Sequence, residues 1–204
     1  MRRSAPTAVF AALLLLLTGV ARTAAQDASP VVFPFTPDPA ECRIAPRPPD
    51  EILGLIASPV AASPTAALTA SALTEAELPA GTPADEMTAG EIVATVRELI
   101  ACNNAGELAR VFALYSDAVL RGALTGDPIA ALALAIAAPP TGGSQAELVD
   151  VRDIRVLDDG RVGAVVEVRD SQRTEIAFLI FARSGDRWLV DALTNVLADG
   201  TPTS

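Results

Sequence analysis

Between residues 88 and 138, hydrophobic residues recur at the three- and four-residue spacing of amphipathic helices. Thr88 and Glu91 form a capping box, which predicts the start of a first helix. Asn104 caps a second predicted helix, and Asp127, followed by a proline, begins a third that ends before Pro139. The apolar faces of the three helices are formed by Ile92, Val96, Leu99 and Ile100, by Leu108, Val111, Phe112 and Tyr115, and by Ile129, Leu132 and Ile136.

After the glycine pair at 142–143 the spacing changes to the two-residue alternation of strands. Turn sequences at 158–160, 171–173 and 184–186 separate four predicted strands. The alternation shifts phase across Arg152 and Asp153, which indicates a β-bulge. Helices followed by strands are typical of an α+β fold. We therefore expect three helices packed on a four-stranded antiparallel meander, forming one domain over residues 86–198.

The first 25 residues have the order of an export signal. Arg2 and Arg3 precede an apolar run from Ala8 to Val20, and small residues lead to a predicted cleavage site after Ala25. The apolar run is short for a bilayer about 30 Å thick, although an uncleaved membrane anchor remains the alternative. The sequence thus predicts a secreted, extracytoplasmic protein with no stable membrane span after cleavage.

Two segments of low complexity precede the predicted domain. Residues 26–57 are rich in proline and contain a short helix, predicted from Asp50 to Ile56, with Ile52, Leu55 and Ile56 on one face. Residues 58–85 are mostly Ala, Pro, Thr and Ser, and we interpret them as a linker because they supply few core residues. Residues 199–204 form a short tail.

Composition excludes several classes of function. The net charge is −10, which disfavours nucleic acid as a partner and repels anionic membrane surfaces. The chain has no His and no Lys, so it lacks a Ser-His or Cys-His pair and a Schiff-base lysine. It also carries no metal-ligand cluster, phosphate loop or nucleotide fingerprint, and we expect neither a metal nor a cofactor.

The chain has two cysteines, Cys42 and Cys102. In an exported protein this pair predicts a disulfide, which would attach the Pro-rich segment to the domain. The alternative is that Cys102 is a small buried apolar residue and Cys42 a free thiol.

Three further stretches carry a resemblance to a known family. They are residues 102–108 leading to 112–117, the hairpin at 158–162, and the closing strand at 185–191. In this order they resemble the nuclear transport factor 2-like superfamily over roughly residues 87–198. The resemblance implies a curved sheet that wraps around helices and encloses a conical pocket. The superfamily includes isomerases, dehydratases, cyclases and non-catalytic binding domains, so the fold alone does not give the function.

The candidate pocket-lining residues are Phe112, Tyr115, Phe178 and Trp188, with packing in the core as the alternative for each aromatic ring. We expect a secreted, non-catalytic module that binds a small apolar ligand or a protein partner, or that forms a homodimer through its sheet. The alternative is an isomerase- or cyclase-like enzyme that uses a carboxylate and Tyr115. A buried carboxylate within reach of Tyr115 would favour the enzyme.

Overall fold

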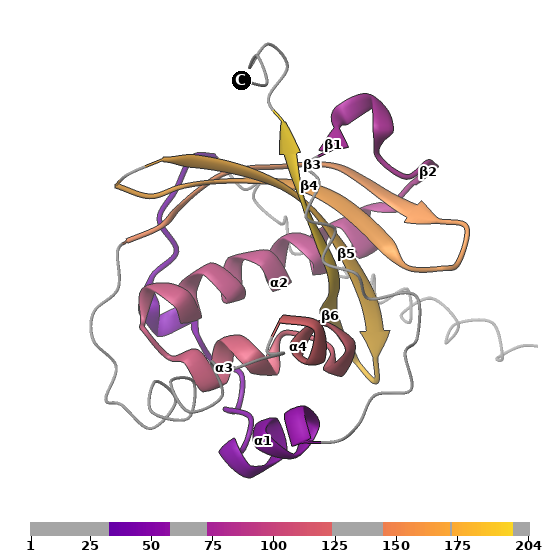
Figure 1. The fold of residues 1–204 in the computed structure, drawn as a ribbon. Coiled ribbons are helices and arrows are strands. Elements are labelled where there is room, and N and C mark those ends of the chain that lie inside the picture. Colours follow the sequence, from indigo (N-terminus) through magenta and orange to yellow (C-terminus); the bar gives the residue numbers. More distant parts are fainter. Residues whose placement is uncertain (1–32, 58–72, 124–144, 172, 198–204) are drawn as a thin grey trace, which may run out of the picture. The chain divides into compact units, whose positions relative to one another are not determined.

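The computed structural model describes residues 33–57, 73–123, 145–171 and 173–197 (Figure 1). The predicted signal peptide, third helix and tail lie outside these residues. The described helices are α1 (Pro49–Ala57), α2 (Glu86–Asn104), α3 (Leu108–Ala113) and α4 (Asp117–Ala123), with 3₁₀ turns η1 (Pro39–Glu41) and η2 (Glu75–Glu77). The strands are β1 (Leu73–Thr74), β2 (Gly81–Pro83), β3 (Glu147–Leu157), β4 (Val162–Arg169), β5 (Thr174–Ser184) and β6 (Arg187–Leu197).

The predicted fold is wrong in its sheet and its helices, although the α+β class still fits. The sheet is mixed and six-stranded, in the order β1-β6-β5-β4-β3-β2, with β1 parallel to β6 and the other pairs antiparallel. Both additional strands come from the segment interpreted as a linker. They contain only two and three residues, none of them buried, so they need no alternating apolar pattern. Four α-helices, rather than three, occur in the described residues.

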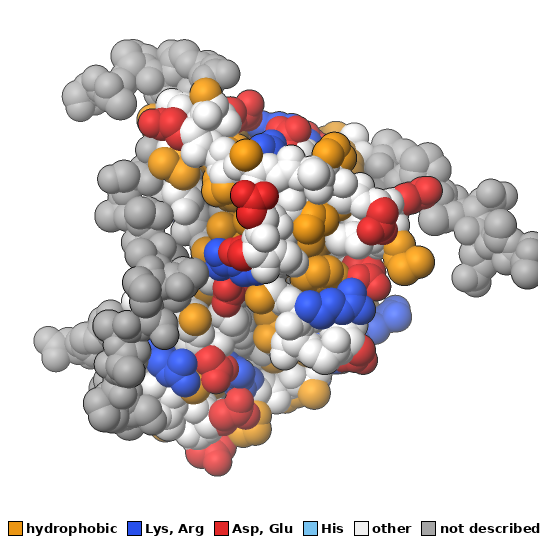
Figure 2. All heavy atoms as spheres, turned by 90° about the vertical axis from the view of Figure 1, so that its right-hand side faces the viewer, with side chains coloured by type: hydrophobic (Ala, Val, Ile, Leu, Met, Phe, Trp, Pro, Cys, Tyr) orange, Lys and Arg blue, Asp and Glu red, His pale blue; other side chains and the backbone are white. Residues whose placement is uncertain are grey.

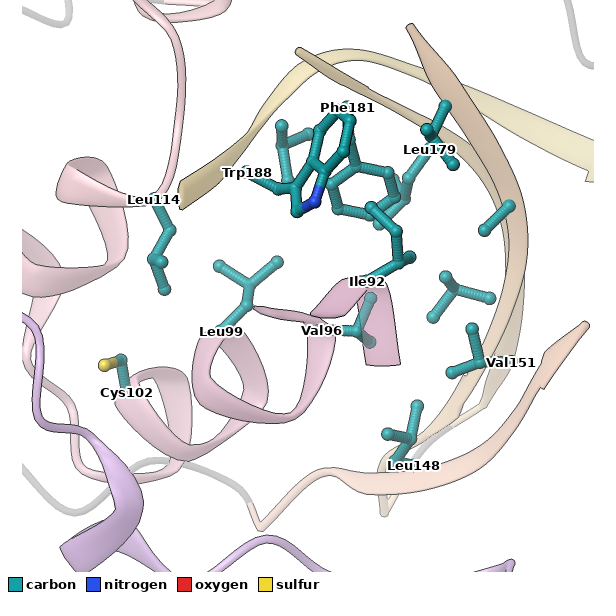
Figure 3. Close-up of a cluster of buried hydrophobic side chains, with 14 of the residues drawn as sticks. Ile92, Val96, Leu99, Cys102, Leu114, Leu148, Val151, Leu179, Phe181 and Trp188 are labelled. Carbon is teal, nitrogen blue, oxygen red and sulfur yellow. The ribbon is translucent and has the colours of Figure 1, made fainter. Parts of the chain in front are cut away.

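The long helix α2 packs against one face of the sheet, which we call the inner face. Ile92 and Val96 are fully buried, and Leu99 is nearly so, as the predicted helical stripe requires. They meet inward side chains of the strands, including Leu179 and Phe181, and the sheet curls around the helix (Figure 3). The helix begins two residues before the predicted cap, because Asp85 accepts a hydrogen bond of 2.8 Å from the Thr88 amide.

The strand predictions from turn and phase are confirmed. The register of β3 against β4 shifts between Arg152 and Arg155, and Asp153 in the bulge has a φ of 53°. Gly160 and Gly185, in the first and third hairpin turns, have positive φ values that a glycine adopts without strain. The meander β3-β4-β5-β6 therefore follows from the sequence.

Residues 73–83, which we call the strap, cross the outer face of the sheet from β6 to β3. Leu78 of the strap is buried against Val165, Phe178 and Val196. β1 and β2 lie five strand spacings apart, about 24 Å in a flat sheet. The chain between them includes the 3₁₀ turn η2 and reaches less than about 24 Å. The strap can connect the two edges only because the sheet is curled.

Residues 33–57, which we call the arm, pack first against α2 and then, through α1, against α4. The arm begins at one edge of the sheet, where Phe35 forms a β-bridge with Leu148. Further along, Cys42 forms a disulfide with the fully buried Cys102 of α2, which confirms the predicted pair. The Glu98 carboxylate accepts hydrogen bonds from the arm amides of Arg43 and Ile44. The predicted short helix is confirmed as α1, and Ile52 is fully buried.

A glycine in β4 makes room for an aromatic ring on the outer face. A Cβ atom added to Gly163 would lie 2.3 Å from the Phe178 ring. We expect Gly163→Ala to lower the free energy of unfolding by about 1–3 kcal/mol, because one of the two groups must move. Urea unfolding measures the loss. The same substitution in a Phe178→Leu background should cost clearly less, and an equal cost in both backgrounds would contradict the explanation.

An ion pair between the arm and α2 makes part of the stability pH-dependent. The Arg97 guanidinium, which bonds to Glu41, holds the pKa of that carboxyl below its ordinary value. A lowered pKa stabilises the fold fully above the ordinary value, about 4.3, and the contribution disappears as the pH falls through the folded-state pKa. Urea unfolding should therefore show a deficit for Glu41→Gln at pH 7 that shrinks by pH 3. A deficit for Glu41→Gln that is the same at both pH values would contradict the prediction.

Candidate functional site

A cavity of about 300 Å³ lies between the helices and the inner face of the sheet. Its walls are mostly aliphatic and come from α2, α3 and strands β4, β5 and β6. The apolar lining residues are Val96, Leu99, Ile100, Val111, Ala146, Val166, Val168, Ala177, Leu179 and Leu193. We call this space the apolar cavity.

Tyr115 places a phenol in the wall of the apolar cavity. The residue lies between α3 and α4, where the backbone pairs with β6: the Ser116 amide donates to the Val190 carbonyl at 2.9 Å, and the Val190 amide donates to the Leu114 carbonyl at 2.9 Å. These two bonds end α3 and fix the tyrosine against the sheet. Burial raises the pKa of Tyr115, so its hydroxyl stays protonated and neutral over the physiological range.

Charged side chains line the cavity at the turn between β4 and β5. Asp170, Arg173 and Glu175 form this charged rim. Arg173 pairs with Glu175 at 2.5 Å, and its amide donates to the Asp170 carboxylate at 2.9 Å. The Arg173 and Glu175 side chains are 70% and 56% exposed. Arg173 and Glu175 are therefore solvated, Asp170 is half-buried, and the rim contains two acids and one cation.

The structure places the four predicted pocket residues in different surroundings. Tyr115 lines the apolar cavity. Phe112 is half-buried on α3 and is not among the lining residues. Phe178 belongs to the outer-face cluster under the strap. Phe178 lies on the outer face of the sheet, and a two-residue alternation alone does not show which face of a sheet meets the helices.

Trp188 lies in the core beneath α2 and is 8% exposed. Its indole N–H donates to Glu91 at 2.8 Å, and the Arg183 guanidinium stacks over the ring at 5.2 Å. The indole borders a second hollow of about 320 Å³, beside Arg43, Glu98 and Arg187. This hollow is open and polar, and the Glu98 carboxylate in it is bonded to the arm.

Asn103 and Asn104 lie at the end of α2, and the structure gives Asn104, which is predicted to cap the following helix, a different role. Asn103 lines the apolar cavity and is exposed. Asn104 is 2% exposed: its amide donates to the carbonyls of Pro37 and Ala146 at 3.2 and 3.0 Å, and its oxygen accepts from the Ala146 amide at 2.7 Å. It therefore ties the arm to the start of β3. The available signal is a polar residue two positions after the buried Cys102.

The electrostatics of the described residues set limits on the chemistry. No group of three or more His, Cys, Asp or Glu side chains there could hold a metal ion. On the face shown in Figure 2, acidic and basic side chains lie intermixed. Arginines of the described residues, such as Arg161 and Arg169, pair with neighbouring acids. Hydrogen bonds to their partners lower the pKa values of Glu41, Glu91 and Asp159, and these three carboxyl groups do not line the cavity.

No helix among the described residues has the length and hydropathy needed to cross a membrane. Comparisons of the chain with protein-family models, with curated proteins and with solved structures found no match.

Proposed function

We propose that this chain is an exported, non-catalytic binding protein that takes a small apolar ligand in the apolar cavity. The observation that carries the proposal is the cavity itself, which lies beside well-packed core residues such as Val96 and Leu179. Ligand sites in proteins have volumes of about 300–1,000 Å³, apolar walls and a few polar groups that orient the ligand. The apolar cavity has this composition, with Tyr115 and Asn103 as its uncharged polar groups.

The position of the acids supports binding over catalysis. An isomerase-like enzyme would need a carboxylate whose pKa is raised by burial, so that it can take a proton near neutral pH. Of the carboxylates in the lining, Glu175 is 56% exposed and paired with Arg173, and Asp170 is half-buried at the same turn. A solvated carboxylate that is paired with an arginine, such as Glu175, suits a charged rim better than a general base, and the Asp170 carboxylate accepts a hydrogen bond from the Arg173 amide.

The outer face of the sheet supports a ligand over a protein partner or a sheet-mediated homodimer. The strap crosses this face, and Leu78 buries part of it. Protein interfaces usually begin as exposed apolar patches. Among the described residues, Met87 is the large hydrophobic residue that is exposed, at 76%, and it stands alone.

Export and the family resemblance are consistent with the proposal. The Cys42–Cys102 disulfide is typical of an oxidising compartment, as the predicted signal peptide would require. The nuclear transport factor 2-like superfamily implies a pocket between helices and the inner face of a curved sheet, and the apolar cavity occupies that position.

Titration of the full chain with N-phenyl-1-naphthylamine, a neutral apolar dye that fluoresces in apolar sites, tests this function. We expect saturable binding of one dye per chain. Ala177→Phe, which places a ring in the cavity, should weaken binding at least about tenfold. Ala182→Phe on the same strand, outside the lining, is the matched control, and thermal unfolding checks that both variants fold. Absence of saturable binding, or equal loss in both variants, would contradict the proposal.

A further inference from the structure

The charged and the uncharged polar groups of the apolar cavity lie in different parts of its wall. The charged side chains that line it, Asp170, Arg173 and Glu175, are all at the β4–β5 turn, and the cation is already paired with Glu175. Beyond the rim, the uncharged polar groups are the Tyr115 phenol and the Asn103 amide. Within the part of the chain that the structure describes, the lining therefore offers a ligand no buried charge of either sign.

A charged group drawn into such a space loses its hydration without gaining a counter-charge. For a carboxylate or an ammonium this loss exceeds what one neutral hydrogen bond returns. A hydroxyl or carbonyl loses far less, and the protonated Tyr115 hydroxyl can donate to it. The interior thus favours an uncharged polar end.

Anions meet a second obstacle outside the cavity. The chain carries a net charge of −10, and the rim places two carboxylates around one arginine. A negative field of this kind lowers the local concentration of anions and slows their association. A carboxylate that stayed at the rim, with its tail inside, would still face Asp170 and Glu175.

We propose that the ligand is an apolar molecule whose polar end is an uncharged hydrogen-bond acceptor, held by Tyr115, and that the apolar cavity discriminates against anionic amphiphiles. This inference rests on the proposed function, since it specifies the ligand of the same cavity.

Competition against bound N-phenyl-1-naphthylamine tests the preference for an uncharged ligand separately from the proposed binding function. The competitors share one tail and differ in the polar end: 1-octanol, octylammonium and octanoate. We expect 1-octanol to displace the dye at a concentration at least about tenfold lower than octanoate, with octylammonium between them. Octanoate or octylammonium binding as tightly as 1-octanol would overturn the inference and leave the proposed function standing. Failure of the dye to bind at all would reject the proposed function instead.

Two substitutions assign the selectivity to residues. Tyr115→Phe should weaken the binding of 1-octanol about fivefold, which corresponds to the loss of one neutral hydrogen bond, and should leave the binding of the dye unchanged. Equal weakening of the dye would show a merely structural role for the hydroxyl and overturn the assignment. Glu175→Gln should reduce the difference in affinity between 1-octanol and octanoate. Asp158→Asn, which removes the same charge at a distant turn, should leave that difference unchanged. An unchanged difference in Glu175→Gln would contradict the role of the rim.

Discussion

Replacing Cys42 and Cys102 together by alanine should lower the free energy of unfolding by about 4 kcal/mol. The disulfide joins residues separated by 60 positions, and a cross-link over such a loop restricts the unfolded chain by about this amount. The loss is a large part of the 5–15 kcal/mol that stabilises a typical domain. Equilibrium unfolding in urea measures it.

Comparison with the reduced wild-type chain separates the stability contributed by the cross-link from that contributed by the packing of Cys102, which is fully buried. Reduction breaks the bond but keeps both sulfur atoms in place. We expect the reduced chain to account for most of the loss, and the alanine variant to lose slightly more because it leaves a small cavity. A difference of less than about 1 kcal/mol between oxidised and reduced chains would show that the arm is held by its other contacts.

Substitution of Asn104 by leucine should cost about 3–5 kcal/mol. The leucine would leave the Ala146 amide, the Ala146 carbonyl and the Pro37 carbonyl without their partner in a buried site. Each buried polar group that loses its hydrogen bond costs about 1–3 kcal/mol. The arm and the start of β3 should both loosen, which hydrogen exchange of the Ala146 and Phe35 amides would detect.

The neighbouring Asn103 provides a matched control, because it has the same chemistry but is exposed. Asn103→Leu should change the free energy of unfolding by less than about 0.5 kcal/mol. Asn104→Asp keeps the acceptor but loses both donated bonds and buries a charge, so it should destabilise the fold as well. Tolerance of Asn104→Leu at the level of Asn103→Leu would contradict the bridging role.

Sequence reasoning succeeded where a short pattern of residues determines the local structure. The stripe from Ile92 to Ile100 gave α2, and the turn at Gly160 gave a hairpin, because periodicity and backbone preference act over a few residues. The disulfide also followed, since two cysteines in a predicted export product leave one intramolecular pair. These features need no knowledge of distant segments.

The strap and the sheet edges could not be predicted in this way. Of the strap's residues only Leu78 is buried, so its composition resembles that of a linker. Its place is set by pairing with β6 and β3, which are distant in sequence. The apolar stripe after Asn104 likewise breaks near Tyr115, where pairing with Val190 ends α3 and a separate helix, α4, begins at Asp117. Tertiary pairing overrides local propensity at these points.

The candidate site has few signals in the sequence. Tyr115 stood out as the single tyrosine on an apolar face. The cavity depends on the separation of α2 from β5, and the charged rim on the β4–β5 turn, so neither has a signature in one stretch of sequence. The roles of Asn103 and Asn104 differ because one faces solvent and the other the arm, and adjacent identical residues do not reveal this difference.

The most direct test of the central claim is to locate a bound ligand by NMR. The full chain, labelled at its methyl groups, is saturated with 1-octanol, and nuclear Overhauser effects between ligand and protein are recorded. The account predicts cross-peaks from the octyl chain to methyl groups of the apolar cavity, such as those of Leu99, Leu179 and Leu193. Cross-peaks confined to outer-face methyl groups such as those of Val165 and Val196, or none at all, would contradict it.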